Sequence, residues 1–192
     1  LSSAKYFYRR SMVLYEQYHF VKEYIADVYP RYADLLMREH PQASGRSAMK
    51  VEVQRAVRRG MSETRGNPNI HGMAIITLAR FEHWRGRPRA AERTFKKAIM
   101  HSRHYNTRYY EALACYECGV FYDDRACFDE AECMYRRAYD IFSEIGARPY
   151  VEKLARRLRI TDAGEQAGIA SAGRSAVVSA YQMDRLLEIC RD

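Results

Sequence analysis

The sequence has 192 residues, 47% of them hydrophobic, which is enough to bury the core of one domain or of a short repeat array. Its 32 Lys and Arg outnumber 24 Asp and Glu, and the formal net charge of +8 permits nucleic acid or acidic partners. No apolar run approaches the roughly 18 residues that cross a bilayer, and Leu1–Arg10 lacks the apolar stretch of a signal peptide, so we expect no membrane association.

The N-terminal third predicts helices without a clear repeat. Ala4–Val28 is a long aromatic-rich helical segment, and Pro30 marks a boundary because the residue before a proline avoids helical geometry. Tyr32–Glu39 predicts a short helix. Ser47–Arg59 predicts an amphipathic helix that we expect to end at Gly60.

The middle of the chain predicts regular helices joined by short turns. Pro88 suits an early helix position, and Gly146 suits a helix end. The expected helices are Ile70–Arg85, Arg89–His104, Arg108–Tyr122, Phe128–Ile145 and a final capping helix, Tyr150–Ile160.

Two stretches within these helices match each other when shifted by 40 residues. Each has a small residue, then Ala, then an aromatic residue, then Ala, in the pairs Ala79/Gly119, Ala91/Ala131, Phe95/Tyr135 and Ala98/Ala138. Small residues let the two helices of a hairpin cross closely, and the aromatic ring fills the gap to the next hairpin. A period of this length indicates stacked supersecondary units.

This pattern resembles the tetratricopeptide repeat (TPR), in which these four positions are the signature. The resemblance implies an all-α fold, an α-α superhelix of TPR-like helical hairpins. A usual TPR unit has about 34 residues, so this one carries roughly six more. We assign the surplus to longer helices and to a longer connector near His101–Thr107.

A more specific resemblance covers the C-terminal part of the chain. Tyr109–Leu154 resembles the TPR-like helical region of large bacterial multidomain signalling proteins, which also carry STAND-type ATPase, kinase or adenylate-cyclase domains. Ser179–Ile189 resembles the lead-in to such an output domain. The resemblance implies that this segment senses or relays a signal. The absence of an initiator Met suggests a piece of a longer protein.

Four regions follow from this pattern. Residues 1–65 are expected to form degenerate hairpins, and residues 66–160 to form two TPR-like hairpins with a capping helix. Residues 161–176 are rich in Gly, Ala and Ser, which predicts a flexible linker. Residues 177–192 predict the start of a helix that leads to a following domain.

The sequence gives no motif for catalysis, a cofactor or a metal. It contains no Gly-rich phosphate loop and no nucleophile elbow, so we expect this segment not to be an enzyme. Cys115 and Cys118 form a C-x-x-C pair, yet they fall on packing positions where Cys behaves as a small hydrophobe. His101 and His104 lie at a helix end, where a capping or solvent role is expected. The odd number of cysteines, five, favours a reducing, cytoplasmic setting.

The better candidate is a surface for a partner. In TPR arrays the first helix of each hairpin lines the concave face, and the corresponding positions here are Met73, Ile76, Arg80, His83, Trp84, Leu113, Tyr116, Val120, Asp123 and Asp124. Trp84 and Arg80 are residue types enriched at binding hot spots. The alternative for Trp84 is that it packs against a neighbouring hairpin.

The expected partner is a protein, a peptide or a neighbouring domain of the same chain. The Lys/Asn set of TPR carboxylate clamps is missing, so recognition of a C-terminal tail is not expected. The alternative is a basic all-α nucleic-acid-binding domain, but the basic doublets are spread along the chain instead of being clustered. The segment before residue 28 offers a face that can cap the array or form a homodimer.

Overall fold

The computed structural model describes residues 2–18, 26–40 and 47–159. Within these ranges it contains eight α-helices and no strand, so the all-α class is confirmed. The helices are α1 (Ser2–Tyr18), α2 (Val28–Glu39), α3 (Ser47–Glu63), α4 (Pro68–Trp84), α5 (Pro88–His104), α6 (Arg108–Asp123), α7 (Phe128–Glu144) and α8 (Arg148–Leu158). The expected linker at 161–176 and helix at 177–192 lie outside the described residues.

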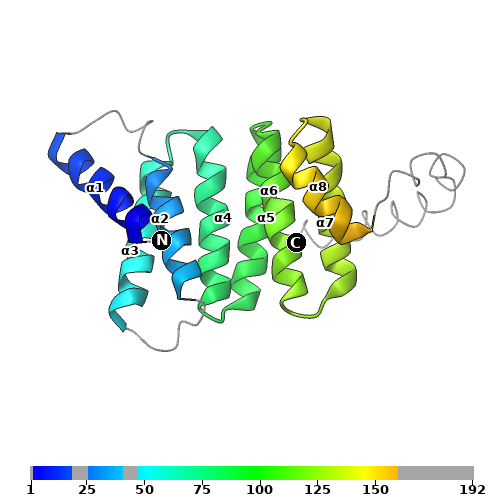
Figure 1. Cartoon of the computed structure of the whole chain (residues 1–192), viewed down its shortest axis with the longest axis horizontal. Coiled ribbons are helices and arrows are strands. Elements are labelled where there is room, and N and C mark those ends of the chain that lie inside the picture. The colour runs from blue at the N-terminus through cyan, green and yellow to red at the C-terminus, as the bar shows by residue number, and fades with distance from the viewer. Residues whose placement is uncertain (1, 19–25, 41–46, 160–192) are drawn as a thin grey trace, which may run out of the picture.

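The helices form successive packed pairs along the chain. α2 packs on α3, α4 on α5 and α6 on α7, and α8 covers α7 at the far end. Figure 1 shows these pairs following one another along the long axis of the molecule, from α1 at one end to α7 and α8 at the other. Helices α4 to α8 begin and end within two residues of their predicted bounds.

The turns between these helices share one hydrogen-bonding pattern. At Gly86, Asn106, Ala126 and Gly146 the backbone enters the left-handed region, with φ of 72°, 52°, 57° and 69°. The N–H of each next residue donates to a carbonyl five residues back, as from Arg87 to Glu82 at 2.9 Å. This is the Schellman motif, which ends one helix and directs the chain into the next.

The same motif recurs every 20 residues, which corrects one expectation. The connector near His101–Thr107 is not extended: α5 runs to His104, and only Tyr105, Asn106 and Thr107 separate it from α6. The residues beyond a usual TPR unit therefore lie in the helices, which have 16 or 17 residues each from α4 to α7.

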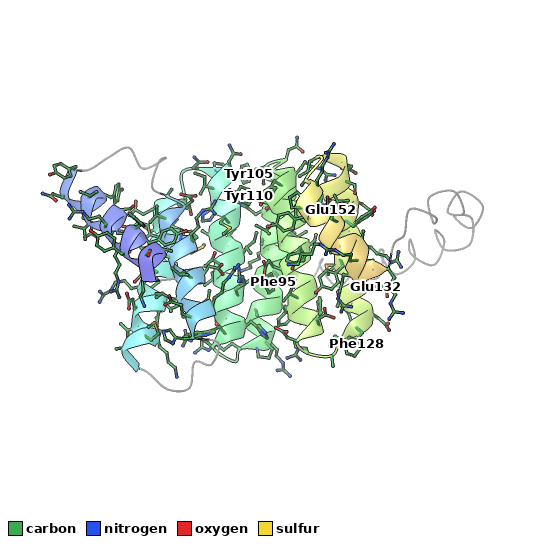
Figure 2. The ribbon with its side chains drawn as sticks, viewed as in Figure 1. Phe95, Tyr105, Tyr110, Phe128, Glu132 and Glu152 are labelled. Atoms are coloured by element: carbon green, nitrogen blue, oxygen red, sulfur yellow. The ribbon has the colours of Figure 1, made fainter. Side chains whose placement is uncertain are left out.

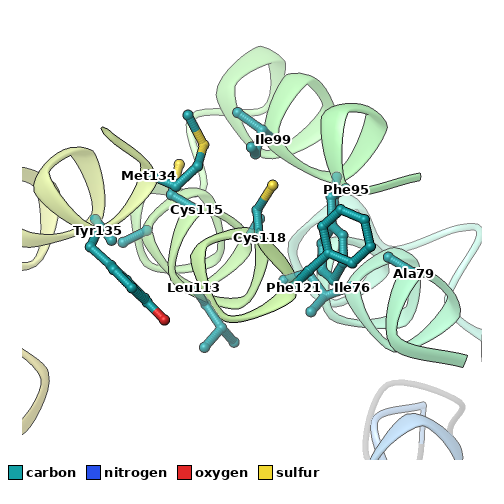
Figure 3. Packing of buried hydrophobic residues seen from close by; sticks show 14 of the residues in the cluster. Ile76, Ala79, Phe95, Ile99, Leu113, Cys115, Cys118, Phe121, Met134 and Tyr135 are labelled. Carbon is teal, nitrogen blue, oxygen red and sulfur yellow. The ribbon is translucent and has the colours of Figure 1, made fainter. Parts of the chain in front are cut away.

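The eight residues that define the repeat all lie in the core. Seven of them are at most 5% exposed, and Gly119 is also buried. A Cβ on Gly119 would come within 2.6 Å of the Tyr135 ring, so the small residue lets α6 and α7 cross closely. Phe95 contacts Phe121 of the next hairpin with ring centroids 5.6 Å apart, which confirms the gap-filling role predicted for it. Figure 3 shows the Phe95 and Phe121 side chains lying together between the two hairpins.

The N-terminal third corrects two expectations. Ala4–Val28 is not one helix, because α1 ends at Tyr18 and residues 26 and 27 form a turn before α2. Gly60 does not end α3, which continues to Glu63. A Cβ at Gly60 would lie 2.9 Å from Cδ of Pro30, so this glycine marks the crossing of α3 with the first turn of α2.

None of the described helices combines the length and the apolar character needed to cross a bilayer.

Candidate functional site

Five of the predicted contact residues, Asp124 among them, meet in one groove. Arg80, His83 and Trp84 of α4 and Val120 of α6 line a hollow of about 190 Å³. The other lining residues are Met37 and Arg38 of α2, Phe95 of α5, and Glu117, Phe121 and Asp124 of α6 and its end. We call this surface the α4–α6 groove. This groove joins the hairpin α4–α5, the hairpin α6–α7 and helix α2.

Charged side chains link three helices at the base of this groove. The Arg80 guanidinium lies 2.5 Å from Asp34 of α2 and 3.5 Å from Glu117 of α6. Arg38 pairs with the same Asp34 at 2.9 Å. Burial raises the pKa of the Glu117 carboxyl; Arg80 opposes this shift and Asp34 adds to it. Arg80 is therefore a bridge that positions α2, α4 and α6, and it is only 22% exposed to a partner.

Two aromatic side chains form the rim of the groove. His83 lies edge-on to Phe121, with ring centroids 5.1 Å apart, and its Nε2 is 3.1 Å from Asp124. The Trp84 indole N–H donates to the His40 carbonyl at 2.6 Å, and its ring stacks on Phe81. Trp84 thus packs against the preceding helix pair, as the alternative prediction for this residue stated. The rest of its surface lines the groove.

Ile76 and Met73 do not reach this groove. Ile76 is 1% exposed within the core, so its assignment as a partner contact is wrong. The Ile76 side chain lies in the hydrophobic core between α4 and its neighbours, where a partner cannot reach it. Met73 is half-buried and packs against the same core. Met37 and Arg38, which do line the groove, were missed because α2 carries no repeat signature.

Tyr116 and Asp123 belong to a second surface, between α6, α7 and α8. A hollow of about 620 Å³ is lined there by Tyr116, Tyr135, Pro149, Lys153, Leu154, Arg156 and Arg157. We call this surface the α8 groove. A smaller hollow of about 370 Å³ adjoins it at Tyr135 and Arg157 and extends to Phe128 and Glu132 of α7. Figure 2 labels these two α7 residues and Glu152 on α8.

Asp123 holds α8 in place at this surface. It accepts hydrogen bonds from Arg157 at 2.7 Å to each carboxylate oxygen and from the Tyr135 hydroxyl at 2.7 Å. Although burial acts in the opposite direction, these hydrogen bonds hold the pKa of Asp123 below its usual value. Asp123 is thus occupied within the fold and is not a free contact for a partner.

A buried carboxylate elsewhere in the repeat is structural. Glu111 is 2% exposed and is met by three guanidinium groups, from Arg103 at 3.3 Å, Arg108 at 2.9 Å and Arg137 at 2.7 Å. These arginines come from α5, α6 and α7. The cluster ties two hairpins together, and it was not predicted because Arg137, which completes it from α7, lies 26 residues from Glu111.

The cysteine candidates and His101 have packing roles, whereas His104 is exposed to solvent, as predicted. Cys115 and Cys118 are at most 2% exposed in the core, and burial raises the pKa of the Cys115 thiol. Their predicted role in the core is confirmed. His101 is only partly exposed: its Nε2 lies 3.2 Å from the Pro68 carbonyl and its ring lies edge-on to His71. In the described part of the chain, no three His, Cys, Asp or Glu side chains gather in a way that could hold a metal.

No family model matches this chain, and no curated protein matches it significantly.

Proposed function

We propose that this chain is a TPR-like protein-interaction module, a short α-α superhelix that binds a protein, a peptide or a neighbouring domain. In this proposal it is the sensory or regulatory segment of a larger cytoplasmic signal-transduction protein, and the chemistry resides in other domains. The observation that carries the proposal is the α4–α6 groove, where Arg80, His83, Trp84 and Val120, all predicted contacts from two successive repeats, line one hollow.

The electrostatics of the molecule favour a protein partner over nucleic acid. Each basic doublet has at least one member paired with a carboxylate: Arg59 with Glu63, Lys96 with Glu92, Arg136 with Glu132 and Arg157 with Asp123. A nucleic-acid surface needs cations gathered on one face. The α4–α6 groove instead brings together Trp84, Met37 and Arg80, and aromatic residues, Met and Arg are enriched at protein interfaces.

Binding in this groove would act through the packing of the hairpins. A partner that contacts α4 and α6 together favours the arrangement in which Arg80 bridges Asp34 and Glu117. It can regulate a neighbouring domain only if it binds two arrangements of the module with different affinity.

The test is affinity capture with Val120→Glu, which places a carboxylate beside Asp124 and Glu117, and with His83→Ala. Met100→Glu is the matched control, since Met100 is 58% exposed on α5 and lines none of the grooves. Folding of each variant is checked by circular dichroism. The proposal predicts one protein that wild type and Met100→Glu retain and that both groove variants lose. Equal retention by all four proteins, or retention of nucleic acid alone, contradicts it.

A further inference from the structure

The α8 groove combines aromatic walls with an excess of cations. Helix α8 carries four cations, Arg148, Lys153, Arg156 and Arg157, against one carboxylate, Glu152. Of the three cations that line the groove, Arg157 pairs with Asp123. Lys153 and Arg156 are exposed and form no ion pair within the described residues; Arg156 donates only to the Glu152 backbone carbonyl, at 3.2 Å.

Two of these cations, Lys153 and Arg157, pack against aromatic rings. The Lys153 ammonium lies 4.8 Å above the Tyr116 ring, and the Arg157 guanidinium lies 5.5 Å from the Tyr135 ring centroid. Such cation–π contacts restrain long side chains that otherwise lose rotamer freedom on binding. Lys153 and Arg157 are therefore ordered before a ligand arrives, and the rings beside them offer apolar contact.

We propose that the α8 groove binds an acidic peptide segment of a partner, with carboxylates on Lys153 and Arg156 and an apolar side chain against Tyr116. Charge complementarity argues for this occupant: the unpaired groups are cationic, and the groove, at about 620 Å³, has room for several side chains. A nucleic-acid strand fits less well, because the Glu132 carboxylate lines the adjoining hollow and Arg157 is already paired with Asp123.

This inference rests on the proposed function in taking a protein as the partner, but the site is separate. Val120 and His83 do not line the α8 groove, and Lys153 and Arg156 do not line the α4–α6 groove. Either groove can therefore fail its test while the other passes.

The experiment measures fluorescence anisotropy of a short labelled peptide of alternating acidic and Leu residues, with wild type and with Lys153→Glu/Arg156→Glu. The control is Arg93→Glu/Lys97→Glu on α5, where both side chains are exposed and Arg93 also donates to the carbonyl four residues back. Reversing two exposed charges is expected to weaken binding about tenfold. The control variant should bind like wild type.

Two further probes make the result specific. A peptide with Gln in place of each acidic residue should bind wild type more weakly than the acidic peptide does. Its affinity for the Lys153→Glu/Arg156→Glu variant should equal its affinity for wild type. The proposal is overturned if the α8 variant and the α5 control bind the acidic peptide alike. It is also overturned if single-stranded DNA displaces the peptide from wild type with a steep salt dependence, since that indicates phosphate contacts.

Discussion

At the scale of single residues, the repeat depends on positions where no larger side chain fits. Ala79 and Gly119 occupy the same repeat position, and at Gly119 a Cβ would come within 2.6 Å of the Tyr135 ring of the same hairpin, which leaves no room for it. The packing of α6 on α7 thus requires glycine, whereas the packing of α4 on α5 accepts alanine.

Gly119→Ala is therefore expected to destabilise the chain by about 1–3 kcal/mol, because the new methyl overpacks against Tyr135. Gly66→Ala is the control: a Cβ at Gly66 meets nothing within 4 Å, so its effect should stay within about 0.5 kcal/mol. Urea unfolding followed by circular dichroism measures both. Equal effects of the two substitutions would show that the crossing is looser than described.

A second residue-scale prediction concerns acid. Burial lowers the pKa of His71 from its usual 6.5, and the nearby His101 and Arg65 lower it further. Below pH 6.5 the unfolded chain then binds more protons at His71 than the folded chain does. The contribution of His71 to the free energy of unfolding is therefore fully present above pH 6.5 and is lost as pH falls through the lowered pKa.

His71→Gln removes this titration. The free energy of unfolding of the variant should fall less than that of wild type between pH 7 and pH 5, measured by urea unfolding at each pH. Parallel pH profiles for the two proteins would sink the prediction, because they would mean that His71 titrates alike in the folded and unfolded chains.

At the scale of elements, one turn geometry spaces the helices. The four Schellman turns place Gly, Asn, Ala and Gly at the left-handed position, at residues 86, 106, 126 and 146. Glycine adopts this conformation freely and asparagine tolerates it, whereas alanine is strained there. Ala126 is thus the least favourable residue among the four turns.

Ala126→Gly should therefore stabilise the chain. A left-handed alanine costs roughly 1–2 kcal/mol, and the larger unfolded-state entropy of glycine offsets about 0.4–1 kcal/mol of that. The net gain is about 0.5–1 kcal/mol, seen as a higher urea midpoint with an unchanged slope. The reverse change, Gly86→Ala, should lower the midpoint. A loss of stability in Ala126→Gly would contradict the described turn.

At the scale of the whole molecule, the sequence predicted best where the contacts are local. The helices of the repeat follow from small residues, Pro88 and Gly146, whose effects act within one turn or one hairpin. The α4–α6 groove was predicted only from the side of α4 and α6. The α2 wall of the groove could not be predicted, because the helix pair α2 and α3 lacks the repeat pattern.

Contacts between distant residues explain the remaining differences. Trp84 donates to His40, 44 residues away, and Glu111 accepts from Arg137, 26 residues away. Spacing rules for a single helix do not reach such pairs. Because of such contacts, Asp123 holds helices together and does not bind a partner, whereas Trp84 does the first and also lines the groove. TPR-like function itself stays a proposal.

The central claim is that the α4–α6 groove contacts a protein partner, and photo-crosslinking tests it most directly. A benzophenone amino acid is placed at position 83 or 120 in the full-length protein in its native cells, with position 100 on α5 as the control. The account predicts one crosslinked protein from positions 83 and 120 that is missing from position 100. The same products from all three positions, or none from the groove, would contradict it.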